Sequence, residues 1–304
     1  MSIVIDGRKN ADQLMSELGV LTQVFHKETG KRPGLAVLRI GENPASKLYV
    51  EKKGRAASEL GYLFEEHAFP ENITNAFLEA KIKRLNADDN IHGIIIQLPL
   101  PQHLDTPGLL SLIDPSKDVD GLHPLNAGRL CEGFSPLFTP CAPLACLSLI
   151  QTVEQNLEGL NVGIVGSSFL VGKPMAMLML QQDCTVCMGH IKTRNLSDLC
   201  KTSDILVVAI GCPNFIPGNW IKKGAIVIDV GVNRLPSGKL AGDVDFVSAQ
   251  KRAKAITPVP GGVGPMTVAI LMRNTLEAAY NFVDISFSLS WGNGNELARK
   301  TYKS

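Results

Sequence analysis

Short apolar runs, each closed by glycine, recur through the second half of the chain. The runs cover residues 162–165, 184–189, 204–211 and 225–231. They are rich in β-branched residues, and segments with helical or irregular patterns separate them. Strands of this kind, buried on both faces and alternating with helices, form parallel doubly wound sheets. The pattern therefore predicts a Rossmann-type sheet, with ligands bound beyond the carboxyl ends of its strands.

The first half of the chain has its own alternation of helices and strands. Helical periodicity covers 9–28, 43–61 and 73–86, and strand-like runs cover 34–41, 62–69 and 92–99. A helix from about 141 to 155 connects the two halves, and another runs from 266 to about 279. A chain of 304 residues can bury two cores. We predict an α/β protein with two domains, an N-terminal α/β domain and a Rossmann-type domain.

The stretch 161–180 resembles a nucleotide-binding turn. The strand at 162–165 stops at Gly166, and small residues lead through Gly172 and Pro174 into an apolar helix. Glycine permits a sharp turn and a close approach of helix to sheet, and proline fits a first helical turn. Free N–H groups at a helix start favour a pyrophosphate. The glycines stand six apart, which is not the GxGxxG spacing, so an ordinary strand-to-helix turn is the alternative.

The end of the second strand of this domain bears on the choice of cofactor. An NAD site usually carries an acidic residue about 20 positions after the first glycine. The corresponding segment, 187–194, has no carboxylate and contains Lys192 and Arg194. Basic side chains suit a ribose phosphate, so we favour NADP over NAD. A solvated basic loop is the other interpretation of these residues.

Composition and charge exclude several classes of function. There are 30 basic and 29 acidic residues, a formal charge of +1, so no global field favours nucleic acid or a membrane. Apolar runs are too short to span a bilayer, and the N-terminus has no signal-peptide pattern, so a cytoplasmic location is expected. The seven cysteines suggest reduced thiols, and the Cys184–Cys187 pair is interpreted as core. No histidine spacing indicates a metal.

The helix predicted at 43–61 carries the most informative residue of the first half. Tyr49, Lys53, Ala56 and Leu60 share one face at helical spacing, and polar side chains occupy another. Lys53 is therefore expected to point inward. Such a lysine either extends its amine to solvent or lines a cleft, where partial burial would favour acid/base chemistry.

Three other segments carry candidate ligand-binding residues. Gln97 interrupts an apolar run at the carboxyl end of its strand, where its amide could hold a ligand or the lysine. Residues 114–130 are predicted to form a long polar loop, with Asp118 and Asp120 before a glycine. Residues 257–271 begin with three prolines and three glycines within nine positions, typical of a rigid loop that presses its backbone against a flat ligand.

Together these segments closely resemble the bifunctional methylenetetrahydrofolate dehydrogenase/methenyltetrahydrofolate cyclohydrolase family. The matching stretches are PASKLYVEKK, GIIIQLPLP, DPSKDVDGLHPLNAGRL, GxSxxVGKPM, DILVVAIG, GAIVIDVGVNR, GDVDF and ITPVPGGVGPMT. They run in the family's order over roughly residues 1–280. The resemblance implies a folate-binding domain over 1–141 plus 275–304, an NAD(P)-binding domain over 142–274, and a homodimer. Residues 285–304 match nothing and receive no role.

The resemblance also implies residue roles. Lys53 would be the catalytic lysine, Tyr49 would stack near the pterin, Gln97 would hold the lysine, and Asp120 would bind the pterin. Further substrate contacts would come from Leu98, Pro260, Gly261 and Gly262. The cofactor positions would be Gly166, Ser167, Ser168, Val171, Gly172, Ile191, Lys192 and Val232. The family usually has arginine at position 167, serine at 191 and threonine at 142, where this chain has Ser167, Ile191 and Ala142; Lys192 and Arg194 could compensate for the first two.

The reaction implied is hydride transfer from methylenetetrahydrofolate to NADP, followed by hydrolysis of the methenyl product to formyltetrahydrofolate, without a metal. It would serve one-carbon metabolism and purine biosynthesis. One rival is another two-domain NADP-linked dehydrogenase such as a shikimate dehydrogenase, which would not predict the loops around Asp120 and Gly261. A second rival is a non-catalytic nucleotide-sensing module, against which the inward lysine argues.

Overall fold

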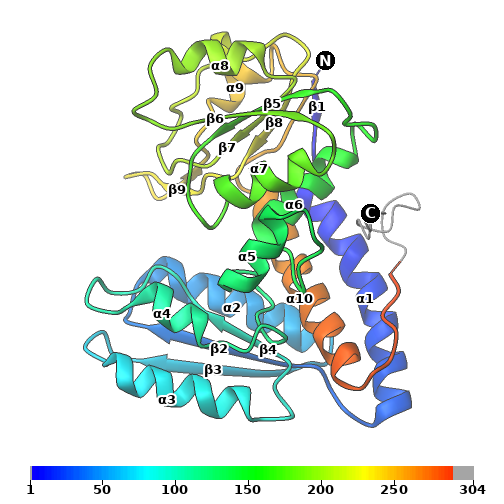
Figure 1. Ribbon diagram of the computed structural model, residues 1–304. Coiled ribbons are helices and arrows are strands. Elements are labelled where there is room, and N and C mark those ends of the chain that lie inside the picture. The colour runs from blue at the N-terminus through cyan, green and yellow to red at the C-terminus, as the bar shows by residue number, and fades with distance from the viewer. Residues whose placement is uncertain (1, 290–304) are drawn as a thin grey trace. The chain divides into compact units, whose positions relative to one another are not determined.

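The computed structural model describes residues 2–289 and divides them into two compact units (Figure 1). The larger sheet lies in a unit made of residues 2–12, 130–134 and 142–267. The smaller sheet lies in a unit made of residues 13–129, 135–141 and 268–289. The α/β class and the two parallel sheets confirm the prediction.

The larger unit is built on a parallel six-stranded sheet. Its order is β1 (Ile3–Val4), β11 (Ala255–Ile256), β8 (Ile226–Asp229), β7 (Ile205–Val208), β5 (Asn161–Val165) and β6 (Thr185–Gly189). The four predicted strands are present, but β6 was wrongly expected to be buried on both faces. It is an edge strand, and Cys187, interpreted as core, is exposed, whereas Cys184 is buried. All seven cysteines are free.

Short helices and a hairpin complete the larger unit. They are α7 (Gly172–Leu180), α8 (Leu196–Thr202), the 3-10 turn η1 (Gly218–Trp220), α9 (Phe246–Ala249) and the pair β9 (Asn233–Arg234) and β10 (Leu240–Ala241). Fully buried Leu206, Val208 and Val227 from the central strands pack with Ile221 and Ile256 in one apolar cluster. This cluster anchors the central strands, whose carboxyl ends carry the loops described below.

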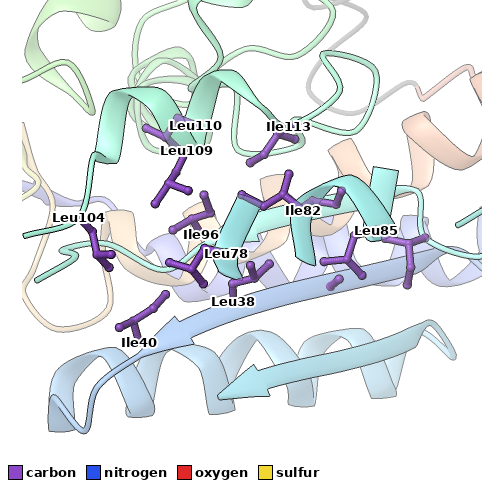
Figure 2. Close-up of a cluster of buried hydrophobic side chains, with 13 residues drawn as sticks. Leu38, Ile40, Leu78, Ile82, Leu85, Ile96, Leu104, Leu109, Leu110 and Ile113 are labelled. Carbon is purple, nitrogen blue, oxygen red and sulfur yellow. The ribbon is translucent and has the colours of Figure 1, made fainter. Parts of the chain in front are cut away.

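The smaller unit has a parallel three-stranded sheet in the order β3 (Leu63–Phe69), β2 (Gly34–Ile40), β4 (Gly93–Ile96). Every residue of the central strand β2 is buried. Its helices include α2 (Pro44–Glu59), α3 (Asn75–Asn86) and α4 (Thr106–Ser111). Figure 2 shows the apolar cluster that α3 and α4 form with the sheet. Leu78, Ile82 and Leu85 recur at helical spacing there, each stabilising the fold by about 1.5–3 kcal/mol.

The smaller unit also contains most of two long helices. α1 (Gly7–Thr29) and α10 (Val263–Phe282) contact each other through Tyr280, whose hydroxyl donates to the Leu21 carbonyl at 2.9 Å and whose ring lies 5.1 Å from that of Phe25. α6 (Cys141–Gln151) begins at the last residue of the stretch 135–141 of this unit, and the rest of the helix belongs to the larger unit. No helix in the described part of the chain is long and apolar enough to cross a membrane.

One expectation about a segment was wrong, and the expected domain bounds stay a prediction. Ile3 and Val4 pair with β11, so residues 2–12 group with the larger unit, whereas the resemblance implied a folate-binding domain that includes them. Residues 114–130 are not a loop throughout, since α5 (Pro124–Cys131) begins at Pro124, a residue suited to a first helical turn. The part of the expected folate-binding domain at 290–304 lies outside the described residues.

Candidate active site

Helix α2 carries the predicted lysine and is fixed at its start and along one face. The Asn43 side chain accepts hydrogen bonds from the N–H groups of Ala45 (2.9 Å) and Ser46 (3.2 Å), a typical N-cap. Gly54 lies against the Phe64 ring, since a Cβ at this position would sit 2.8 Å from a ring carbon. This close approach sets the height of Lys53, the preceding residue, above the sheet.

The lysine meets the glutamine that follows β4. Lys53 Nζ donates to Gln97 Oε1 at 3.0 Å. Gln97 is held in turn, because its Nε2 donates to the Leu98 carbonyl at 2.9 Å and its backbone N–H donates to Leu38 at the same distance. The amide therefore presents its oxygen to the ammonium. Both side chains are half-buried, so they can also reach a ligand.

Tyr49 lies one helical turn before Lys53 on the same face, as predicted. It is half-buried, and burial raises the pKa of its phenol. The ring is thus an uncharged apolar surface with a hydroxyl at its end, which suits stacking against a flat heterocycle. The opposite face of α2, with Lys47, Glu51 and Arg55, is exposed.

The segment after α4 forms a tight turn around Asp120. The Gly121 N–H donates to the Asp118 carbonyl at 3.0 Å, and Gly121 has φ +71°. The Asp118 carboxylate accepts from the N–H groups of Leu122 (3.0 Å) and His123 (2.8 Å) and from Asn126 Nδ2 (2.7 Å). Burial raises the pKa of Asp118 to about 6. Asp118 is thus buried structure, while the half-buried Asp120 remains available for a ligand.

A cysteine that sequence reasoning did not assign to the site lies beside these charges. Cys141 is fully buried, and burial raises the pKa of its thiol; the charge of Asp120 and a hydrogen bond to it act in the same direction, and the nearby Lys53 acts in the opposite one. Lys53, Asp120 and Cys141 therefore belong to one cluster, although 88 positions separate the first from the last. The only signal for Cys141 in the sequence was its position at the start of a predicted helix.

The nucleotide turn of the larger unit has the geometry predicted from its glycines. Gly166 has φ +131°, and a Cβ there would lie 2.2 Å from the Ala209 carbonyl oxygen. Gly172 begins α7, and its Cβ would lie 2.0 Å from the Gly166 carbonyl oxygen. The Ser168 hydroxyl accepts from the Val171 N–H at 3.2 Å. These contacts close the turn without side chains between strand and helix.

The remaining cofactor positions lie on exposed loops of the same unit. Ser167, Ser168, Ile191, Lys192 and Val232 are all exposed. The Lys192 N–H donates to His190 Nδ1 at 3.2 Å, which shapes the loop after β6. The exposed serines and the turn fit the phosphates of a dinucleotide, because Gly166 and Gly172 carry no Cβ and the turn leads into the N-terminus of α7.

Two buried carboxylates that sequence reasoning missed hold the neighbouring strand ends. Asp243 accepts from the N–H groups of Ile210 (2.7 Å) and Gly211 (2.9 Å). Asp229 accepts from those of Gly231 (3.1 Å) and Asp243 (2.9 Å), and burial raises its pKa to about 7. The signal lay in the motif GDVDF, whose first aspartate follows a glycine with no room for a Cβ.

The proline- and glycine-rich loop belongs to the larger unit, whereas Lys53 belongs to the smaller one. Gly261 has φ +107°, and its carbonyl accepts from the Arg8 N–H at 3.1 Å. Gly262 packs directly against Gly7, where a Cβ would meet its carbonyl oxygen. The backbone of Pro260, Gly261 and Gly262 is therefore fixed from within its own unit.

The fold and these residues define a class: an enzyme with a Rossmann-type dinucleotide domain and a second α/β unit that presents a lysine, a glutamine and an aspartate. Residues 5–120 match the tetrahydrofolate dehydrogenase/cyclohydrolase catalytic domain, and residues 140–283 match the NAD(P)-binding domain of the same family. The chain belongs to the tetrahydrofolate dehydrogenase/cyclohydrolase family. Among residues 2–289, no cluster of three or more His, Cys, Asp or Glu side chains could hold a metal ion.

Relatives cover nearly the whole chain. The bifunctional protein FolD of Zymomonas mobilis is 46% identical over 295 residues, covering 94% of this chain and 99% of that protein. FolD 2 of Geobacter metallireducens is 49% identical over 92% of this chain and 97% of its own length. The crystal structure of the Campylobacter jejuni FolD dehydrogenase/cyclohydrolase has a TM-score of 0.90 at 44% identity, covering 92% of this chain and 99% of that one.

A second solved structure carries ligands. The Trypanosoma brucei methylenetetrahydrofolate dehydrogenase-cyclohydrolase, complexed with NADP and an inhibitor, has a TM-score of 0.90 at 39% identity and covers 93% of this chain and 98% of that one. The rival interpretation of the chain as a shikimate dehydrogenase is set aside by the family membership.

Proposed function

We propose that this enzyme oxidises methylenetetrahydrofolate to methenyltetrahydrofolate with NADP and then hydrolyses the product to formyltetrahydrofolate. The contact that carries the proposal is the 3.0 Å hydrogen bond from Lys53 to Gln97 on the same unit as Asp120. A family match over both domains supports it. The complex of the Trypanosoma brucei relative supports NADP as the cofactor.

Each residue of the smaller unit has a distinct task in this proposal. Asp120 accepts two parallel hydrogen bonds from the amino group and adjacent ring N–H of the pterin. The Tyr49 ring stacks against the substrate, and Leu98 forms part of the wall. Lys53, oriented by Gln97, moves protons as water adds to the methenyl carbon and the ring opens. Such acid/base assistance is typically worth about 10² to 10⁴ in rate.

The larger unit binds the cofactor, which accepts the hydride when bound. The backbone of the turn between Gly166 and Gly172 and the exposed Ser167 and Ser168 hold its phosphates. Val232 borders the nicotinamide half. Pro260, Gly261 and Gly262 supply a stiff backbone edge for the folate.

NADP is preferred to NAD because the loop after β6 is basic. Ser167 and Ile191 replace an arginine and a serine that usually help to hold the ribose phosphate in this family, and the exposed Lys192 and Arg194 take over that charge. The KM for NADP is expected to be at least tenfold below that for NAD, about 1.4 kcal/mol of selective binding. A lower KM for NAD would refute the assignment.

The family resemblance also supports proposals about the oligomeric state, the cellular location and the metabolic role. We propose a homodimer, a cytoplasmic location, and a supply of one-carbon units that includes purine biosynthesis. Light scattering coupled to gel filtration measures the assembly, and a monomer at micromolar concentration would contradict it.

The deciding experiment is a steady-state assay with methylenetetrahydrofolate and NADP. Reduced cofactor should accumulate, and methenyltetrahydrofolate supplied alone should be hydrolysed faster than in buffer. A nucleotide-sensing module would bind NADP and turn over neither folate. That outcome would refute the proposal.

A further inference from the structure

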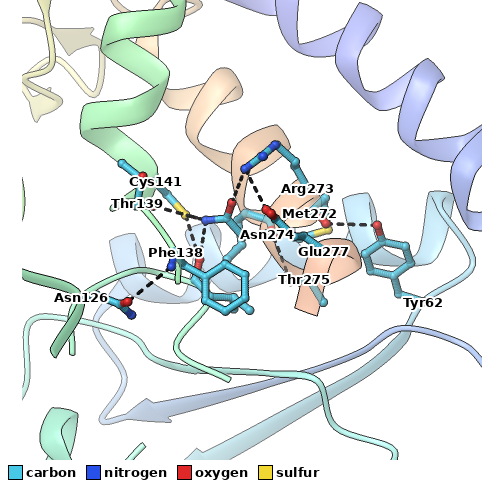
Figure 3. A network of polar contacts seen from close by, with 12 residues as sticks. Tyr62, Asn126, Phe138, Thr139, Cys141, Met272, Arg273, Asn274, Thr275 and Glu277 are labelled. Atoms are coloured by element: carbon cyan, nitrogen blue, oxygen red, sulfur yellow. Dashed lines mark hydrogen bonds and ion pairs between the residues drawn. The ribbon is translucent and has the colours of Figure 1, made fainter. Parts of the chain in front are cut away.

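A buried asparagine of α10, far from Asp120 in the sequence, holds two backbone segments near Asp120. Asn274 of α10 has no exposed surface, and its Nδ2 donates to the carbonyl oxygens of Val119 at 2.9 Å and Thr139 at 3.3 Å (Figure 3). Its Oδ1 accepts from Arg273 Nη1 at 3.0 Å. Both ends of the amide are thus engaged, which fixes its orientation.

The Val119 carbonyl belongs to the peptide unit that leads into Asp120. A peptide unit is planar, so fixing its oxygen also fixes the N–H and Cα of the next residue. Cys141 Sγ lies 3.3 Å from the same oxygen. Asn274 and Cys141 therefore together hold the peptide unit from which Asp120 extends.

The second carbonyl that Asn274 holds supports the other side of the turn. A Cβ on Gly121 would lie 2.7 Å from the Thr139 carbonyl carbon and 2.6 Å from the Pro140 nitrogen. The turn residue after Asp120 is therefore packed on the Thr139–Pro140 peptide. One buried amide thus ties together both segments between which the Asp120 turn is held.

The hydrogen bonds of Asn274 differ from those of the next buried polar residue of α10. The neighbouring Thr275 is equally buried, and its hydroxyl donates to the Leu271 carbonyl within the same helix. Burying an amide is unfavourable unless it is hydrogen-bonded, and here both bonds that its nitrogen makes to backbone go to the Asp120 surroundings.

We propose that Asn274 is a positioning residue for folate recognition, which acts through Asp120 and does not touch the substrate. This inference rests on the proposed function of Asp120 as the pterin-binding carboxylate. The chemical class it serves is the aminopyrimidinone edge shared by both folate substrates, so loss of Asn274 should weaken binding in both reactions.

The test compares Asn274→Ala with the matched neighbour Thr275→Val in the full-length enzyme. In Asn274→Ala the KM values for methylene- and methenyltetrahydrofolate should rise about tenfold or more, the scale expected when a binding group is displaced, while the KM for NADP stays within about twofold. Thr275→Val removes a buried hydrogen bond of α10 without touching the turn, and should leave all three KM values unchanged. A merely structural role would lower the melting temperature and leave the folate KM values unchanged, which would overturn the inference.

A milder variant decides the matter if Asn274→Ala does not fold. Arg273→Met removes the donor that holds Asn274 Oδ1 and leaves the amide in place, so a smaller rise in the same two folate KM values is expected. Unchanged folate KM values in this variant would count against Asn274. A wild-type enzyme without turnover of methylenetetrahydrofolate would refute the proposed function itself, whereas an active wild type whose variants keep its KM values refutes only the positioning role.

Discussion

The hydrogen bond between Lys53 and Gln97 can be tested by a double-mutant cycle on the hydrolysis reaction. The donor is an ammonium and the acceptor a half-buried amide 3.0 Å away. A hydrogen bond to a charged group contributes about 1.5–3 kcal/mol, which corresponds to about 10- to 150-fold in rate. Gln97→Ala should slow hydrolysis by a factor in that range, and Lys53→Met by about 10² to 10⁴.

The decisive measurement is the hydrolysis rate of the double variant. If Gln97 acts by holding the lysine, adding Gln97→Ala to Lys53→Met should cost less than about threefold, and the coupling energy should be about 1.5–3 kcal/mol. The assay follows the loss of the methenyl chromophore, with NADP binding as a measure of fold and Lys47→Met, on the exposed face of α2, as a control. Fully additive losses in the double variant would mean that Gln97 works independently of the amine.

Two further variants and a pH series test the remaining framework. In Gly172→Ala the new Cβ would collide with the Gly166 carbonyl oxygen, so the KM for NADP should rise about tenfold and stability should fall by about 1–3 kcal/mol. The control Gly128→Ala lies within helix α5 and meets nothing within 4 Å, so it should leave the KM for NADP unchanged and raise stability by about 0.4–1 kcal/mol. Titration with NADP and thermal melts measure both. Burial raises the pKa of Asp118 to about 6 and that of Asp229 to about 7, from 3.8. These two carboxyls therefore bind more protons in the folded protein than in the unfolded chain, and their contribution to the free energy of unfolding falls as pH rises from about 4 to about 7. Burial lowers the pKa of His92 from 6.5 to about 4, which acts in the opposite direction over that range. Urea titrations of the wild type and of Asp229→Asn isolate the aspartate, because the free energy of unfolding of the variant should have a more positive slope with pH than that of the wild type. An unchanged slope in that variant would exclude Asp229 as a source.

The hydrophobic pattern was sufficient to predict the sheets and the face of α2, because burial imposes a period on long elements. The inward face predicted for Ala56 and Leu60 follows from that period and is confirmed by their burial. It was insufficient for β11, because two residues cannot display a period. The helix α5 was missed for a different reason: its polar, glycine-containing sequence has the composition of a loop, and packing around the buried Asn126 decides its conformation.

Buried polar side chains were the least predictable part of the site. The number of N–H donors that a lysine uses within the protein distinguishes a structural lysine from one that can act on a ligand. Lys117 is buried, and its ammonium donates to three carbonyls at the end of α3, those of Leu85 (3.2 Å), Asn86 and Asp88 (2.8 Å each). An ammonium has three N–H donors, so none is left for a ligand. Lys53 makes one hydrogen bond to the residues of 2–289, to Gln97. Its other two donors can meet substrate or water, and this difference between two lysines of one unit is the physical reason to place the proton transfer at Lys53.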